Sequence, residues 1–235
     1  MLSVTAIDVY IQASHILRRV SLEVAAREVV CLVGRNGAGK TTTLRAVMGY
    51  LRPRTGRIAF RGQEIQGRRT HEIARLGLGF APEDSGIFPD LTVAENIEIS
   101  TWTRPGGRPA AERLEVAYGV FPALRRYMAR KGPEMSGGER KMLSIARALA
   151  LDADMLLLDE PFEGLSPAII PAVSEGIASI TRLGHSILIA ESNIYHVPEF
   201  AARLYVIERG EIIFAGRPGD VHSDRAVMRV IGGAA

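Results

Sequence analysis

Apolar and polar positions alternate along this chain in a way that predicts strands and helices in turn. Residues 29–33, 155–158 and 186–190 are continuous apolar runs, which are typical of strands covered on both faces. Residues 21–24 alternate apolar and polar positions, as a half-exposed strand does. Helical patterns separate the apolar runs. We therefore expect an α/β fold in which helices cover a largely parallel sheet.

The remaining elements follow from the same patterns and from the glycines and prolines between them. Helices are expected at residues 42–51, 64–76, 144–151 and 167–181, strands at 57–60 and 78–81, and a hairpin at 203–214 that turns at Arg209 and Gly210. Residues 84–135 lack the alternation of strands and helices seen elsewhere. They contain helix-favouring stretches on both sides of a break at 103–109. We expect this segment to be a helical subdomain inserted in the α/β chain.

Composition and charge exclude only a few classes of protein. The 235 residues are 47% hydrophobic, and the net charge of +3 with a pI near 9.2 is too small to indicate nucleic acid or an acidic membrane surface. No apolar run approaches the roughly 20 residues that cross a bilayer, and the N-terminus does not resemble a signal peptide. The single cysteine, Cys31, lies in an apolar run and is expected to pack in the core. These observations predict a protein of the cytosol or of the cytosolic face of a membrane.

Residues 34–42 carry the clearest chemistry in the chain. They follow an apolar run and match the phosphate-binding pattern GxxxxGK[ST]. Glycines let successive N–H groups turn toward phosphate oxygens, Lys40 can reach the β- and γ-phosphates, and the Thr41 hydroxyl can ligate Mg²⁺. The candidate nucleotide-binding residues of this loop are Gly34, Arg35, Asn36, Gly37, Ala38, Gly39, Lys40, Thr41 and Thr42. By itself the loop is compatible with a kinase, a GTPase or a transporter ATPase.

Two more motifs follow this loop. Asp159 and Glu160 end the apolar run at 155–158, where the ligands of open α/β sheets bind. Asp159 is suited to hold Mg²⁺, and Glu160 is suited to orient or deprotonate a catalytic water. The other motif opens a helix with Ser136, Gly137, Gly138 and Glu139, whose free N–H groups can hold an anion or can simply form an N-cap.

In this order, the three motifs resemble those of the ATP-binding subunit of ABC transporters. Residues 136–140 are similar to the LSGGQ-type signature of that family, and the likeness extends over essentially the whole chain. Within the family, the chain is most similar to the smaller ATPase subunit of branched-chain amino-acid importers. This narrower likeness rests on residues 36–44, 82–83, 87–89, 91–93 and 163–167.

The resemblance implies a P-loop NTPase fold in one domain, residues 1–235, with a mostly parallel core sheet, an antiparallel β subdomain and the helical subdomain at 84–135. It also implies an ATPase that uses ATP and Mg²⁺ and acts at the cytoplasmic face of the membrane. The solute it takes up would be an amino acid, first of all a branched-chain one, or a related small polar solute such as an amide or urea. The implied partners are a second ATPase subunit, two transmembrane permease subunits and, indirectly, an extracytoplasmic solute-binding protein, with no nucleic acid. The resemblance favours a heterodimer of ATPase subunits and leaves a homodimer open. ATP would lie between the phosphate loop of one subunit and the signature of the other, where Ser136 and Gly138 meet the γ-phosphate.

The chain departs from the family pattern at three positions of this implied site. Glu83 replaces a glutamine and would meet Mg²⁺ or its waters, as is common in the branched-chain group. Ser192 stands where a γ-phosphate-sensing histidine is usual, so it would reach phosphate through water, and His196 lies nearby. Ile11 aligns with the aromatic residue that stacks on adenine. Either aliphatic contact replaces this stacking, or the strand register brings Tyr10 to the base.

Two other functions compete with an import ATPase. Ser192 and Ile11 are compatible with a regulatory subunit that binds ATP and hydrolyses it weakly. The presence of Lys40, Asp159 and Glu160 argues against this hypothesis. The other alternative is an ABC ATPase without a transport role, but the chain has no second cassette and no room for a long coiled coil.

Overall fold

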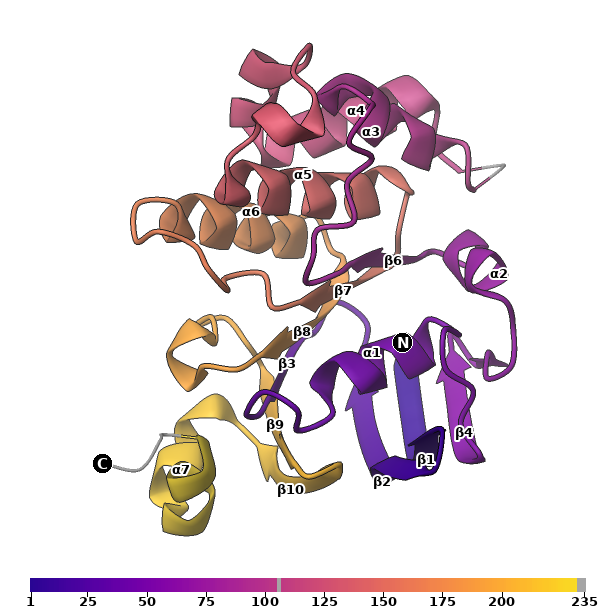
Figure 1. The fold of residues 1–235 in the computed structure, drawn as a ribbon, viewed down its shortest axis with the longest axis vertical. Helices are drawn as coiled ribbons and strands as arrows, with labels where there is room; N and C mark the ends of the chain where they lie inside the picture. The colour runs from indigo at the N-terminus through magenta and orange to yellow at the C-terminus, as the bar shows by residue number, and fades with distance from the viewer. Residues whose placement is uncertain (105–106, 232–235) are drawn as a thin grey trace. The chain divides into compact units, whose positions relative to one another are not determined.

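The computed structural model describes residues 1–104 and 107–231. It divides into two compact units, the first formed by residues 1–73 with the segment from 186 onward, and the second by residues 74–185. Each unit combines helices with strands, so the predicted α/β class is confirmed (Figure 1).

The first unit contains an antiparallel sheet with the strand order β2-β1-β4-β5. Its strands are β1 (Leu2–Ile11), β2 (Ser14–Val24), β4 (Thr55–Phe60) and β5 (Gln63–Glu64). Leu2 and Val4 are buried at alternate positions of β1, and so are Ile7 and Val9 after a register shift between Val4 and Ile7, because successive side chains of a strand point to opposite faces. This is the antiparallel β part that the resemblance implied.

The same unit holds strands of the core sheet in the order β10-β9-β3-β8. They are β3 (Val29–Val33), β8 (Ser186–Glu191), β9 (Arg203–Glu208) and β10 (Glu211–Gly216). β3 is parallel to both β8 and β9, and all five of its residues are buried, as its apolar run predicted. Cys31 is completely buried in β3, and this burial raises the pKa of its thiol, so the expected core position is confirmed.

The helices of this first part of the chain are shorter than the sequence pattern predicts. They are α1 (Lys40–Val47), α2 (Thr70–Arg75), where the chain passes to the second unit, and α7 (Arg225–Ile231). The expectations of a helix to residue 51 and of one from residue 64 were wrong. Gly49 and Gly67 adopt left-handed conformations that end or delay the helices, and Glu64 pairs with Ala59 as a strand residue.

The second unit pairs two parallel strands with helices. These elements are β6 (Leu78–Ala81), α3 (Val93–Thr101), α4 (Ala110–Val120), α5 (Gly137–Ala150), β7 (Met155–Asp159) and α6 (Ile170–Arg182). α5 packs against α3, α4 and α6. The helix expected at residues 167–181 is α6. The prediction that it begins at residue 167 was wrong, because Ile169 is its N-cap and a turn precedes it.

Helices α3 and α4 and two short 3₁₀ helices, Pro122–Tyr127 and Gly132–Glu134, occupy residues 84–135. The predicted break at 103–109 separates α3 from α4, although residues 105–106 lie outside the described residues. These helices support our proposal that residues 84–135 form an inserted helical subdomain. Within the described parts of the chain, no helix is both long enough and apolar enough to span a membrane.

Candidate functional site

The phosphate loop joins β3 to α1 in the first unit. β3 ends at Val33 and α1 begins at Lys40, with Gly39 as its N-cap. Gly37 and Gly39 have φ angles of 82° and 117°, a left-handed conformation that residues with side chains rarely adopt. The sequence therefore produces the strand, glycine loop and helix start that phosphate binding requires.

Lys40 lies inside this loop. Its side chain is buried, and its Nζ atom donates hydrogen bonds to the carbonyl oxygens of Gly34, at 2.6 Å, and Arg35, at 3.2 Å. The ammonium group is therefore held at the centre of the loop, where an anion bound to the loop amides would meet a positive charge.

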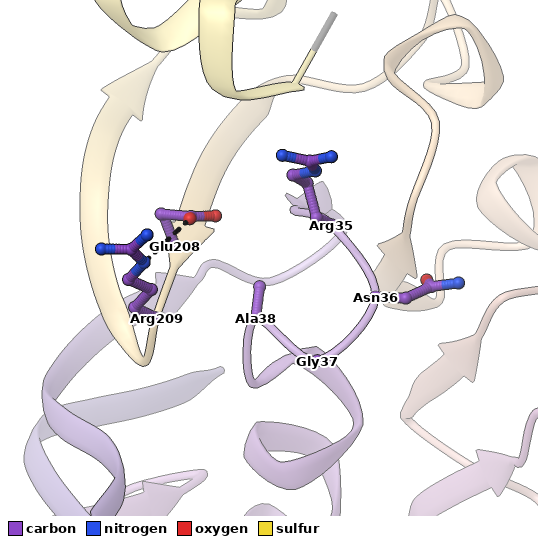
Figure 2. A pocket seen from close by; sticks show the side chains of 6 residues that line it. All are labelled: Arg35, Asn36, Gly37, Ala38, Glu208 and Arg209. Atoms are coloured by element: carbon purple, nitrogen blue, oxygen red, sulfur yellow. Dashed lines mark ion pairs between the residues drawn. The ribbon is translucent and has the colours of Figure 1, made fainter. Parts of the chain in front are cut away.

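The hairpin turn between β9 and β10 braces the phosphate loop. Gly210 donates its backbone N–H to the carbonyl of Ala38 at 2.8 Å, and its own carbonyl accepts a bond of 2.8 Å from Arg18 in β2. Arg35, Asn36, Gly37 and Ala38 line a pocket of about 300 Å³ with Glu208 and Arg209 of this hairpin (Figure 2). The sequence predicted the turn, but it gave no sign of this contact with the loop.

We predict that Gly210→Ala weakens ATP binding roughly tenfold, because small displacements of a binding group have large effects. A Cβ atom on Gly210 would lie 2.0 Å from the carbonyl oxygen of Ile16, so the turn must shift, and its hydrogen bond to Ala38 is disturbed. Fluorescent-nucleotide titration measures the effect.

Gly62→Ala is the matched control for this prediction. Arg61 and Gly62 form the two-residue turn between β4 and β5 with φ angles of 52° and 77°, close to the 49° and 82° of Arg209 and Gly210. Nothing lies within 4 Å of a Cβ on Gly62, so this variant has the same backbone strain without the clash. Equal ATP affinity of the two variants would contradict a bracing role for Gly210.

Ser192 follows β8 directly and lies beside the beginning of the phosphate loop. The preceding residue, Glu191, accepts a backbone bond of 3.1 Å from Gly34 and is completely buried. His196 contacts the same Glu191, with 3.2 Å between Nδ1 and Oε2. The histidine near Ser192 therefore already has a carboxylate partner.

Tyr10 and Ile11 end β1 with different surroundings. The Tyr10 ring stacks on His15, with ring centroids 4.2 Å apart and an interplanar angle of 6°, and the Arg54 guanidinium lies 5.2 Å from its centroid. The side chain of Ile11 is 43% exposed. Tyr10 is thus engaged by neighbours within the chain, whereas Ile11 faces solvent.

In the second unit, Asp159 ends β7 and Glu160 begins the following turn. Both residues are buried, with 2% and 3% of their surfaces exposed. Glu160 has a φ angle of 48°, in the left-handed region that disfavours a residue with a side chain. Such strain persists only where surrounding contacts impose it, and it is frequent at functional sites.

Glu83, Glu160 and Glu163 form an acidic group in this unit. The pKa of Glu163 is raised by burial and by the negative charges of Glu160 and Glu83, while Lys141 on α5 opposes the shift. The Lys141 Nζ atom donates to the carbonyl oxygens of Glu83, at 2.6 Å, and Glu160, at 2.8 Å. The sequence motifs do not include Lys141, although helical periodicity places it in phase with apolar Ile145.

The signature motif opens α5 with a capping box. The Ser136 hydroxyl accepts a hydrogen bond from the Glu139 N–H at 3.3 Å, and the Glu139 carboxylate accepts one from the Ser136 N–H at 2.7 Å. Burial alone would raise the pKa of Glu139, but the bonds from Ser136, a bond from Tyr127 and the charge of Arg130 together lower it. Gly137 is exposed and Gly138 is buried, packed so closely that a Cβ on Gly138 would lie 2.5 Å from Ile169.

The predicted site residues therefore form two groups. The phosphate loop, Ser192, Tyr10 and Ile11 belong to the first unit, and Glu83, Asp159, Glu160 and the signature belong to the second. Across residues 1–104 and 107–231, no three His, Cys, Asp or Glu side chains are arranged to hold a metal ion by themselves. Mg²⁺ commonly needs only one or two protein oxygens beside substrate phosphates, so the oxygen donors Thr41, Asp159 and Glu83 fit it chemically.

Comparisons with known proteins agree with this set of motifs. A family model described as "ABC transporter" matches residues 17–163. The lipopolysaccharide export ATP-binding protein LptB of Acidithiobacillus ferridurans is 36% identical over 92% of this chain and 89% of its own length. The branched-chain amino acid transport ATP-binding protein BraG of Pseudomonas aeruginosa is 35% identical over 91% of each chain. LivF of Archaeoglobus fulgidus, named as a probable protein of the same kind, is 33% identical over 88% of each.

Solved structures show the same fold. The ADP conformation of an ATP-binding cassette of an ABC transporter has a TM-score of 0.84 at 27% identity, covering 100% of this chain and 99% of that one. A nucleotide-free ATP-binding cassette has a TM-score of 0.85 with the same identity and coverage. Fold, motifs and relatives agree: the chain belongs to the ABC transporter family as an ATP-binding subunit, an ATPase that couples ATP hydrolysis to transport.

Proposed function

We propose that this chain is the ATPase subunit of an ABC importer that takes up amino acids, with branched-chain amino acids as the first candidates. Two relatives that match most of its length, LivF and BraG, are named for branched-chain amino-acid transport. Glu83 is the observation on the chain itself that carries the assignment. It occupies the position where the branched-chain group commonly has glutamate, in the loop after β6 that Lys141 holds.

ATP and Mg²⁺ are the proposed ligands. The amides of the phosphate loop and the Lys40 ammonium hold the phosphates, while Thr41, Asp159 and Glu83 supply oxygen donors for Mg²⁺ or its waters. The metal neutralises charge on the phosphates and so favours transfer of the γ-phosphoryl group to water.

Glu160 is the proposed general base for hydrolysis. Its carboxylate orients a water molecule and accepts a proton from it as the water attacks the γ-phosphorus atom. Its burial keeps competing bulk water away from the carboxylate. Ser192 is the proposed γ-phosphate contact on the same chain, acting through a bridging water because its side chain is short.

Adenine is proposed to contact Ile11 rather than Tyr10. The parallel stack with His15 occupies the Tyr10 ring, whereas the exposed Ile11 side chain is available for aliphatic contact with a base. Aliphatic contact lacks the offset stacking of two π systems, so we expect weaker affinity for the base than an aromatic residue would give.

A second ATPase subunit and two permease subunits are the proposed partners. Ser136, Gly137, Gly138 and Glu139 would contact the ATP held by the second ATPase subunit, because a capped helix start offers backbone N–H groups to an anion. Phe88 is 44% exposed, with the Arg147 guanidinium 4.7 Å from its ring centroid, and we place it where the permease docks. These contacts would hold the chain at the cytoplasmic face of the membrane, and a solute-binding protein would act only through the permease.

A lipopolysaccharide exporter is the second candidate, because LptB from Acidithiobacillus ferridurans is as similar to this chain as BraG is. The two functions differ in the direction of transport and in the size of the solute. The ATPase chemistry proposed above is common to both.

Reconstituted transport distinguishes these functions. The chain would be assembled in vesicles with its permease subunits and the second ATPase subunit, and ATP-dependent uptake of radiolabelled leucine would be measured with the solute-binding protein present. We expect uptake that stops when Glu160→Gln replaces the wild-type chain. ATP-dependent release of lipopolysaccharide without leucine uptake would support the exporter instead, and absence of phosphate release would contradict any ATPase role.

A further inference from the structure

Helix α5, which begins with the signature motif, carries a lysine on its buried face. Lys141 is 8% exposed, and it occupies the i position of an i, i+4, i+7 series with the buried residues Ile145 and Ala148. A buried ammonium group is strongly unfavourable unless it is paired and hydrogen-bonded. The Lys141 ammonium group therefore needs hydrogen-bond acceptors that offset the cost of its burial.

Two main-chain carbonyl groups bind the Lys141 ammonium. The carbonyl oxygen of Glu83 lies 2.6 Å from Nζ, in the loop that follows β6, and that of Glu160 lies 2.8 Å from it, directly after β7. These segments are distant from each other along the sequence, and each carries a carboxylate proposed to act on Mg²⁺ or water. The lysine joins both of them to the signature helix through charge-assisted hydrogen bonds, which are stronger than neutral ones.

The backbone of Glu160 shows why such a bond matters. Its φ angle of 48° is disfavoured for a residue with a side chain, and its carbonyl also accepts a bond of 3.3 Å from the Glu163 N–H. The bond from Lys141 fixes the orientation of the same peptide group. The direction of the Glu160 side chain depends on this peptide, so the lysine orients the carboxylate although it bonds to the main chain.

The charge of Lys141 also acts on the carboxylate of Glu163, which belongs to the acidic group. Burial raises the pKa of Glu163, the negative charges of Glu160 and Glu83 raise it further, and the charge of Lys141 lowers it. The positive charge of Lys141 therefore reduces part of the repulsion that Glu160 and Glu83 exert on Glu163.

We infer that Lys141 is a positioning residue for ATP hydrolysis. It holds the main chains at Glu83 and Glu160 from the helix whose first turn faces the partner's nucleotide, and it thereby ties the signature motif to the hydrolytic carboxylate of the same subunit. The inference rests on the proposed roles of Glu83 and Glu160. It adds a residue that contacts neither nucleotide nor metal.

The test separates turnover from binding in the complex that hydrolyses ATP. We expect Lys141→Met to lower kcat roughly 10- to 100-fold, since displacing a catalytic group by about 1 Å costs about this much. ATP affinity, measured by fluorescent-nucleotide titration, should stay within about twofold of wild type, because the phosphate loop is unchanged. Lys141→Gln retains a neutral donor of nearly the same reach and should give an intermediate kcat.

Arg113→Met is the matched control for loss of a buried cation. Arg113 is 5% exposed, and its guanidinium donates to the carbonyl oxygens of Thr101, at 2.9 Å, Arg104, at 3.0 Å, and Arg108. Like Lys141, Arg113 lies in the second unit and donates to main-chain carbonyl groups. Its acceptors are not residues of the acidic group formed by Glu83, Glu160 and Glu163. This variant should lower thermal stability while leaving kcat of the folded protein within about twofold of wild type.

The Glu160→Gln variant distinguishes failure of the inference from failure of the proposed function. If Glu160→Gln abolishes hydrolysis while folded Lys141→Met or Lys141→Gln keeps the wild-type kcat, the role of Lys141 is wrong and that of Glu160 stands. If Glu160→Gln itself hydrolyses ATP at the wild-type rate, the proposed base is wrong and the inference about Lys141 fails with it. A fall of kcat in Arg113→Met equal to that in Lys141→Met would reduce the lysine to a general structural role.

Discussion

Replacing Glu160 by glutamine is expected to lower ATP hydrolysis roughly 10²- to 10⁴-fold, the range that general-base catalysis supplies. Glutamine keeps the length and shape of the side chain in its buried position after β7, but it cannot accept the proton of the attacking water. ATP binding should survive, because the phosphate loop is untouched. Bound ATP should then accumulate in closed dimers, which light scattering detects as a doubled mass after ATP addition.

Glu175→Gln provides the control for this prediction. Glu175 lies on α6 in the same unit, its side chain is 69% exposed, and its ion pair with Arg182 is at the surface. Surface ion pairs contribute little to stability, so this variant should hydrolyse ATP at the wild-type rate. Hydrolysis by Glu160→Gln at the rate of Glu175→Gln would show that another group activates the water. A dimer that forms only after the second ATPase subunit is added would identify the working pair as a heterodimer.

Replacing Lys40 by alanine is expected to weaken ATP binding at least about a hundredfold. Losing hydrogen bonds to a charged group costs about 1.5–3 kcal/mol each, and about 1.4 kcal/mol is a factor of ten in affinity. Lys40 lies at the centre of its loop, bonded to Gly34 and Arg35, so its removal takes the only lysine charge from the loop that wraps the phosphates. Nucleotide titration with ATP and with ADP measures the loss.

Arg45→Ala is the control for loss of a positive charge from the same helix. Arg45 is exposed in the last turn of α1, away from the phosphate loop, and its removal should leave ATP affinity within about twofold. Thermal unfolding of both variants establishes that the loss in Lys40→Ala is not a loss of folded protein. Undiminished ATP affinity in Lys40→Ala would refute the assignment of residues 34–42 as the nucleotide site.

The sequence predicted the buried strands better than the helix boundaries. The apolar runs that became β3, β7 and β8 were assigned correctly, because a strand covered on both faces needs an unbroken run of apolar residues. The predicted helix boundaries were wrong near Gly49 and Gly67, which lie outside α1 and α2. A glycine in a helical pattern can continue the helix or turn left-handed, and contacts from distant segments decide between these conformations.

The sequence by itself determined the family, the phosphate loop and the pair Asp159 and Glu160, because each depends on residue types at fixed short spacing. It also predicted that ATP binding and hydrolysis belong to different motifs. Local spacing is enough for these conclusions, since the geometry of a glycine loop before a helix follows from its own few residues.

Only the tertiary structure decided which distant residues hold these motifs in place. The Gly210 contact with Ala38 depends on the parallel pairing of β3 with β9, and the Lys141 bonds depend on how α5 packs against the loops after β6 and β7. Gly210 and Lys141 both donate hydrogen bonds to main-chain carbonyl groups. Every residue carries such a group, so no side-chain pattern marks the acceptor. The sequence therefore displays the groups that we propose to act on ATP, while the fold brings Gly210 and Lys141 into contact with the segments that carry them.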